Sequence, residues 1–292
     1  MNKLLSADFT RLWKNKVFWL GAACMALLAC WIICIGYGQN VRWADDDIGF
    51  EPNRLDAYLF QFAPMIGGFA AVIISLFLGA DDSDGTIRNK LIVGSRRRDI
   101  YLSNLVVCTA ASLICMAAYL ICAFAVGIPL LGVPTADARM VLACILLCVL
   151  FTTAFSSIFT MLGMLNHNRA GAAVLAILVF LALLFAASYC YNLLQIPEMS
   201  SAAIFTANGM EVGDPQPNPD YVEGEMRNAL QFIVDFLPAG QGILIASYEG
   251  VHLWQMGGYS VLITAATTLL GLFGFSRKDI NCLLYTLTLP TI

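Results

Sequence analysis

The sequence predicts an all-α polytopic membrane protein with six transmembrane helices, an N-terminal interfacial helix, and an outer helical hairpin between spans five and six. Of its 292 residues, 59% are hydrophobic and only 12% are charged, and the mean hydropathy is +0.76. A soluble domain of this length needs more charge to cover its surface, whereas a chain dissolved in lipid exposes apolar side chains. Six long apolar runs and an uneven distribution of Lys and Arg complete the prediction.

Each apolar run is long enough to cross a bilayer core of about 30 Å, which needs roughly 20 residues at the helical rise. The six predicted spans are Val17 to Tyr37, Phe60 to Ala80, Ile100 to Val126, Met140 to Leu165, Ala170 to Tyr191 and Val251 to Phe275.

The basic residues predict that both termini are cytoplasmic, because Lys and Arg are retained on the inner side during insertion. With six spans, twelve of the sixteen basic residues fall in the segments of one side. Fourteen of the twenty acidic residues fall on the other side. That acidic exterior either attracts a cationic substrate or simply complements the basic inner segments, and the second interpretation is favoured.

Residues 1–16 are expected to form a short helix in the inner interface. Leu5, Phe9, Leu12 and Trp13 recur at helical spacing, and the basic side chains are expected to point away from them.

Residues 192–250 form a long outer segment that is expected to contain a helical hairpin. Asn218 is the expected cap of a helix that begins at Pro219 and ends before Pro238. The residues expected to form a lid on this hairpin are Met226, Leu230, Ile233, Leu237 and Pro238.

The span interiors contain no Asp, Glu, Lys or Arg, which disfavours an ion-coupled transporter and an intramembrane protease. They do contain stripes of small and hydroxyl residues that serve either close helix packing or a mildly polar path, with packing favoured. The residues of these stripes are Thr153, Ser156, Ser157, Thr160, Thr264, Thr267 and Gly271.

No metal or disulfide site is expected. Most of the ten cysteines lie inside the apolar runs, where they behave as small hydrophobic residues, and the two histidines lack neighbours at ligand spacing.

Residues 81–99 form the inner loop between spans two and three. The loop runs Asp81-Asp82-Ser83-Asp84-Gly85-Thr86-Ile87-Arg88-Asn89-Lys90-Leu91 and continues to three consecutive arginines. Arginines at the start of a helix oppose its dipole, which indicates either a contact surface for a partner or the positive-inside signal combined with contact with anionic lipid. Ile87, Leu91 and Ile92 are expected to give a short loop helix an apolar face.

This loop resembles the corresponding loop of type-2 ATP-binding-cassette permeases, and most closely that of bacterial exporters of the bacteriocin-immunity and drug-efflux kind. The basic N-terminal helix, the turn Phe236-Leu237-Pro238-Ala239-Gly240-Gln241 and the closing Phe275-Ser276-Arg277-Lys278-Asp279 share the resemblance. Many relatives carry Glu where Asp81 stands.

The resemblance implies a single permease domain over residues 1–292 in a bacterial cytoplasmic membrane, with two permease subunits, identical or related, and two ATPase subunits. Membrane lipid is a further expected partner and nucleic acid is not. The sequence contains no G-x-x-x-x-G-K-[ST] loop, so no cofactor is expected in this chain, and ATP and Mg²⁺ are expected on the partner. The resemblance assigns contact with the ATPase to Arg11, Trp13, Asp81, Gly85, Thr86, Arg88 and Leu91, flanked by Arg96, Arg97 and Arg98.

These expectations favour a non-enzymatic subunit of an exporter that moves a peptide or amphipathic compound. Two alternatives stay open at this point: a channel or secondary transporter that works without ATP, and a membrane sensor or anchoring subunit.

Overall fold

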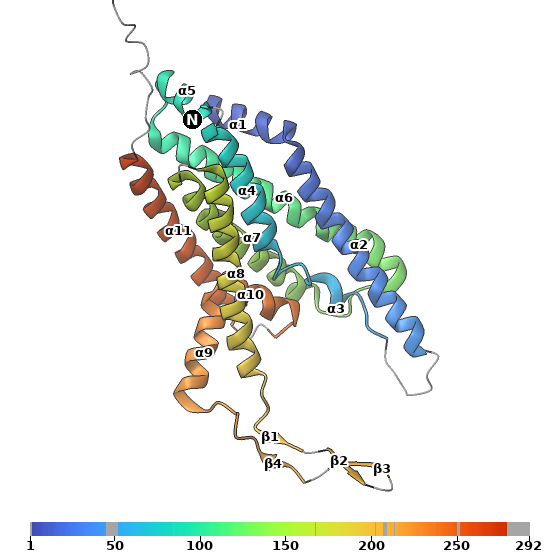
Figure 1. The fold of residues 1–292 in the computed structure, drawn as a ribbon. Helices are drawn as coiled ribbons and strands as arrows, with labels where there is room; N and C mark the ends of the chain where they lie inside the picture. The colour runs from blue at the N-terminus through green and yellow to red at the C-terminus, as the bar shows by residue number, and fades with distance from the viewer. Residues whose placement is uncertain are drawn as a thin grey trace, which may run out of the picture.

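A computed structural model describes residues 2–44, 52–83, 85–166, 168–201, 203–206, 209–212, 214–249 and 252–278. Asp84 and Asp279, which the sequence analysis names, lie outside the described residues, and so does His167, one of the two histidines. The described residues form a helical bundle with two short pairs of strands, and the all-α polytopic class is confirmed (Figure 1).

The long helices coincide with the predicted apolar runs. They are α2 (Lys16–Ala44), α4 (Ile66–Ser83), α6 (Arg97–Leu131), α7 (Ala138–Leu165), α8 (Arg169–Leu194) and α11 (Leu253–Arg277). Five of these helices are individually long and apolar enough to cross a membrane. The shorter α4 forms a candidate span together with α5 (Thr86–Ile92), across a bend of 54°.

The second span begins later than the sequence predicted. Residues 60–65 form turns that follow the short helix α3 (Asp56–Leu59), and α4 starts only at Ile66. Pro64 explains the late start, because proline restricts the residue before it and has no N–H to donate. Phe60 and Phe62 are nevertheless fully buried, so this apolar stretch belongs to the core as a turn.

Helix α7 lies inside the bundle. It packs against α4, α6, α8 and α11, while α2 packs along α6. The short helix α1 (Asn2–Lys14) also packs on α6. Figure 1 shows α1, α5 and the last turns of α11 at one end of the bundle, here named the α5 end. Helix α9 (Gly224–Phe236), helix α10 (Pro238–Ala246) and the strands lie toward the other end, named the α10 end.

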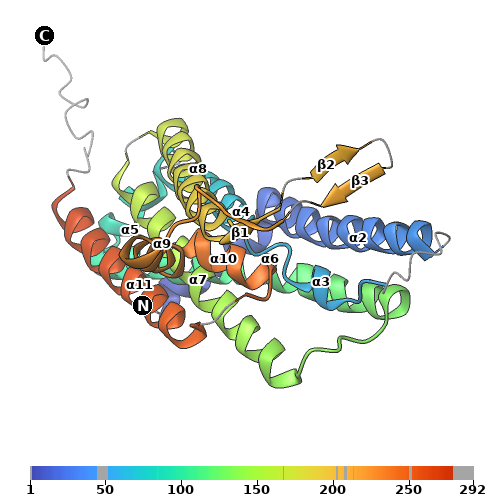
Figure 2. The same ribbon diagram turned by 90° about the horizontal axis from the view of Figure 1, so that it is seen from below.

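The segment after α8 combines strands and helices. Strands β1 (Met199–Ser200) and β4 (Gln216–Pro217) pair antiparallel, as do β2 (Ala203–Thr206) and β3 (Gly209–Val212). Helices α9 and α10 meet at 95°, and Figure 2 shows α10 across the α10 end beside α9. A helical hairpin was predicted in this segment, but the strands were not.

The predicted helix start at Pro219 is wrong. The Asn218 side chain accepts a hydrogen bond from the Asp220 N–H at 3.1 Å, which closes a turn, and α9 starts at Gly224. Gly224 has a φ of 62°, a left-handed conformation that favours glycine and separates the helix from the preceding residues.

Candidate functional site

The strongest cluster of charged side chains in the described residues lies at the α5 end. Arg11 of α1 forms an ion pair with Asp81, which lies near the end of α4. Lys90 of α5 lies 2.6 Å from Asp8 of α1 and 3.8 Å from Asp81. The Ser103 hydroxyl of α6 donates to the second Asp8 oxygen at 2.7 Å. We call Asp8, Arg11, Asp81, Lys90 and Ser103 the ion cluster, and it joins four helices.

The two carboxylates of the ion cluster are buried, and each residue is 1% exposed. A buried carboxylate is tolerated only when it is paired and hydrogen-bonded, and two cations balance the two anions here. The Arg11 guanidinium also stacks on the Phe77 ring, with its carbon 4.0 Å from the ring centroid.

Two of the predicted partner-contact residues, Arg11 and Asp81, pair with each other in the ion cluster. Asp81 is turned inward, and Arg11 points toward it, although the basic side chains of this helix were expected to point away from the packed face. Periodicity could not reveal this pair, because Arg11 and Asp81 are far apart in the sequence. Asp8, Lys90 and Ser103, which complete the cluster, were not predicted as site residues.

Helix α5 supplies Lys90 to the ion cluster and is positioned by further local contacts. Gly85 precedes it with a φ of 67°, which favours glycine, and Ile87 anchors it as a buried residue. Thr86, Arg88 and Leu91 are half-buried, and Leu91 packs against the core. The expected apolar face for a partner is therefore wrong for Ile87, whereas the half-buried Leu91 stays a predicted contact.

The exposed part of α5 is its last turn. Ile92 is 75% exposed and the following Val93 is 85% exposed. Arg96 is exposed nearby along the chain, and so is Arg98. Val93 was missed by the sequence analysis, although an apolar residue beside three arginines was a usable signal.

Arg97 does not face outward with its neighbours. Its guanidinium donates to the carbonyl oxygens of Phe275, Ser276 and Lys278, at 3.4, 3.2 and 2.5 Å. Phe275 and Ser276 belong to the last turn of α11 and Lys278 is its C-cap, so these carbonyls lie at the negative end of the helix dipole. The arginine that opposes the dipole of α6 thus stabilises the end of α11.

Trp13 closes the junction between α1 and α2. It is 49% exposed, and its ring lies 5.9 Å from Phe18 and 5.5 Å from Trp19, centroid to centroid. The Trp19 indole N–H donates to the Trp13 carbonyl at 2.8 Å. This contact fixes how α1 turns away from α2.

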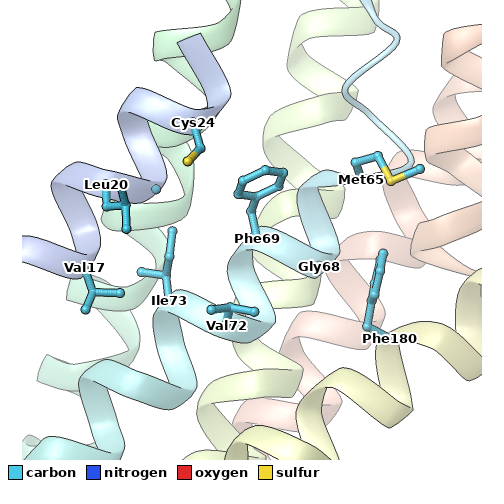
Figure 3. Close-up of a pocket in the computed structure, with 10 residues that line it drawn as sticks. Val17, Leu20, Cys24, Met65, Gly68, Phe69, Val72, Ile73 and Phe180 are labelled. Carbon is cyan, nitrogen blue, oxygen red and sulfur yellow. The ribbon is translucent and has the colours of Figure 1, made fainter. Parts of the chain in front are cut away.

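A second candidate feature is an apolar groove of about 340 Å³ between α2, α4 and α8, named the α2–α4 groove. Figure 3 shows residues of α2 facing Phe69 and Ile73 of α4, with Phe180 of α8 at the far end. The lining residues are Val17, Leu20, Gly21, Cys24, Met65, Gly68, Phe69, Val72, Ile73 and Phe180. None of them is charged, so the groove suits a hydrophobic guest.

The hydroxyl stripes of α7 and α11 mostly lie in the packing between helices. Ser156, Ser157 and Thr160 are fully buried, and the Ser157 hydroxyl lies 2.7 Å from that of Thr267. Gly271 accommodates the Tyr101 ring, whose Cε2 would lie 2.8 Å from an added Cβ. Close packing of this kind is the usual use of small residues in membrane helices.

Thr153 and Thr264 differ from the rest of the stripe, because they line a groove of about 430 Å³ between α7 and α11. Both hydroxyls donate back to carbonyls of their own helices, to Val149 at 2.7 Å and Ser260 at 2.8 Å. Their hydroxyl protons are therefore already used, and each of these two hydroxyls can only accept a hydrogen bond from a guest in the groove.

The helices at the α10 end are tied by buried polar groups. The Gln241 amide donates to the carbonyls of Asp235 and Met256, at 2.9 and 3.0 Å, and accepts from the Ser260 hydroxyl at 2.7 Å. Asp235 also lies 3.2 Å from His252, between its Oδ2 and the ring Nδ1. These contacts fix α9, α10 and α11 relative to one another.

The residues predicted as a lid differ in exposure. Leu230 and Pro238 are buried and Leu237 is half-buried, whereas Met226 and Ile233 are exposed. Helix α9 also buries Val234, which was not among the predicted residues.

In the part of the chain that the structure describes, no group of three His, Cys, Asp or Glu side chains is placed to hold a metal ion. No curated protein matched the sequence. A family model described as ABC-2 type transporter matches residues 2–208, which include α1 to α8 and the whole ion cluster. The match covers most of the chain, so the chain belongs to the ABC-2 type transporter family and is the transmembrane component of an ABC transporter.

Proposed function

We propose that this chain is the permease subunit of an ATP-driven exporter that moves a peptide or an amphipathic compound out of a bacterial cell. A separate ATPase subunit supplies the energy, and ATP and Mg²⁺ bind to that subunit. The absence of a phosphate-binding loop from this sequence supports the division of labour. A second permease subunit, identical or related, completes the pathway.

The observation that carries this proposal is that α5 is tied to three other helices and leaves an apolar end exposed. The ion cluster ties α5 to α1, α4 and α6, while the apolar Ile92 and Val93 stay exposed at its end. Exposed apolar residues beside arginines are typical of protein contact sites. We infer that Ile92 and Val93, with Arg88 and Arg96, contact the ATPase, and that Asp81 and Arg11 act by holding α5 in place.

The orientation of the chain in the membrane follows from its basic residues. The α5 end carries Arg88, Lys90, Arg96, Arg97 and Arg98, so we place this end in the cytoplasm, together with both termini. The helices α9 and α10 then lie on the outer side.

The α2–α4 groove is the proposed site of entry for the substrate. Its apolar lining and open side suit a hydrophobic segment that arrives from the membrane. A second subunit would cover its open side and complete a path.

The test is to co-purify the tagged chain with its ATPase and to measure ATP hydrolysis by the complex. Val93→Asp is expected to lower the amount of bound ATPase at least about tenfold, because a carboxylate in an apolar contact loses its water without gaining a partner. Val133→Asp is the matched control, since Val133 is also exposed and lies after α6, away from the α5 end.

Two results would contradict the proposal. Equal ATPase binding by both aspartate variants would exclude the end of α5 as the contact. Undiminished transport by liposomes that contain this chain alone would favour a channel instead.

A further inference from the structure

A third groove lies at the α5 end, between the start of α6 and the last turns of α11. It encloses about 530 Å³ and is lined by Arg98, Leu269, Leu270, Leu272, Phe273 and Ser276. The stretch from Leu269 to Ser276 covers about 10 Å along the helix axis. The groove is therefore amphipathic, with an apolar wall and a guanidinium at one end.

One arginine lines this groove, and a second lies against the ring of one of its wall residues. Arg98 lines it directly, and the Arg277 guanidinium carbon lies 4.0 Å from the centroid of the Phe273 ring, which forms part of the wall. Both arginines are exposed. Among the described residues, no carboxylate forms an ion pair with either of them.

The neighbouring groups leave these two charges available. Arg97 already donates to the last carbonyls of α11, and Lys278 donates to the carbonyls of Met164 and Asn166 at 2.9 and 2.7 Å. The carbonyls at a helix C-terminus would otherwise repel an anion. Because Arg97 donates to these carbonyls, they repel an anion beside Arg98 less strongly.

We propose that this groove binds an anionic phospholipid of the cytoplasmic leaflet. The phosphate lies against Arg98 and Arg277, and one acyl chain lies along Leu269, Leu270 and Phe273. Anionic headgroups are attracted to basic residues at the inner boundary of a span, and the apolar wall adds contact for the chain. A zwitterionic lipid is bound less well, because its ammonium group meets the same two arginines.

This inference rests on the proposed orientation, and it requires neither ATPase binding nor transport. Native mass spectrometry of the detergent-purified full chain therefore tests it separately from the proposed function. Phosphatidylglycerol is the anionic probe and phosphatidylethanolamine the zwitterionic one. The expected result is preferential retention of phosphatidylglycerol, and a loss of about fivefold in its binding for Arg98→Ala.

Arg96→Ala is the matched control, because it removes the same charge from an exposed residue that does not line the groove. Equal losses for the two variants would show attraction to general surface charge and would overturn the proposal. Equal retention of the two lipids would also overturn it.

A second pair of variants tests the apolar wall without changing the charge. Leu270→Trp fills the groove and is expected to weaken phosphatidylglycerol binding. Leu262→Trp is its control on α11, since Leu262 is similarly exposed and lies outside the groove. If Leu270→Trp binds the lipid as well as Leu262→Trp does, the acyl chain does not occupy this groove and the proposal fails.

Discussion

Replacing Asp81 by alanine is expected to lower the free energy of unfolding by about 3 kcal/mol, because the change leaves the half-buried cations Arg11 and Lys90 without one of their two anions. Asp81 is 1% exposed and pairs with Arg11, while Lys90 lies 3.8 Å away. Thermal unfolding of the purified protein measures the loss. The same variant is also expected to lower the rate of transport, since α5 is no longer held against α1 and α4.

The control for this prediction is Asp214→Ala, which removes a carboxylate from an exposed residue. The double variant Arg11→Leu, Asp81→Leu is expected to recover a large part of the stability, because it removes the pair together. An unfolding temperature of Asp81→Ala equal to that of Asp214→Ala would show that the pair contributes nothing. If the double variant loses as much stability as the single variants Arg11→Leu and Asp81→Leu lose together, the two residues do not interact.

Replacing Gly240 by alanine is expected to destabilise the hairpin of α9 and α10 by about 1 to 3 kcal/mol or more, through overpacking. An added Cβ would overlap the Val234 carbonyl oxygen and lie 2.9 Å from both Cα and C of Val234. These are backbone atoms, so no side chain can rotate to relieve the contact. Thermal unfolding and limited proteolysis measure this effect. The expected results are a lower unfolding temperature and faster cleavage near residues 224–246.

Gly258→Ala is the matched control, because no atom lies within 4 Å of a Cβ added there. It is expected to leave stability unchanged or to raise it slightly, since alanine favours a helix over glycine. If both alanine variants unfold at the same temperature, α9 and α10 do not pack as closely as the geometry of Gly240 requires.

The spans could be predicted from the sequence because apolar runs of this length have few other uses. Their ends were less predictable. The effect of Pro64 on α4 is local and was available from the sequence, whereas the extension of α2 to Ala44 passes through polar residues such as Asn40 and Arg42. The strands of the outer segment were missed, although Asn208-Gly209 is a dipeptide typical of hairpin turns.

The candidate site was predictable as a region and not as a set of contacts. The resemblance to type-2 ATP-binding-cassette permeases pointed to Arg11 and Asp81, and the three arginines stood out because they oppose the dipole of the helix that they begin. The sequence could not show that Arg97 stabilises α11, since that contact joins residues about 180 positions apart. Pairing between distant charges depends on how the helices pack, which periodicity does not encode.

The bond between Ser103 and Asp8 has a mechanical consequence. Asp8 is held at the same time by Lys90 of α5, so a displacement of α5 is passed to the first turns of α6 through two short polar contacts. Helix α6 has 35 residues and is therefore a rod about 50 Å long. A tilt of about 5° would shift its far end by roughly 4 Å, so a small movement at one membrane face becomes a larger one at the other.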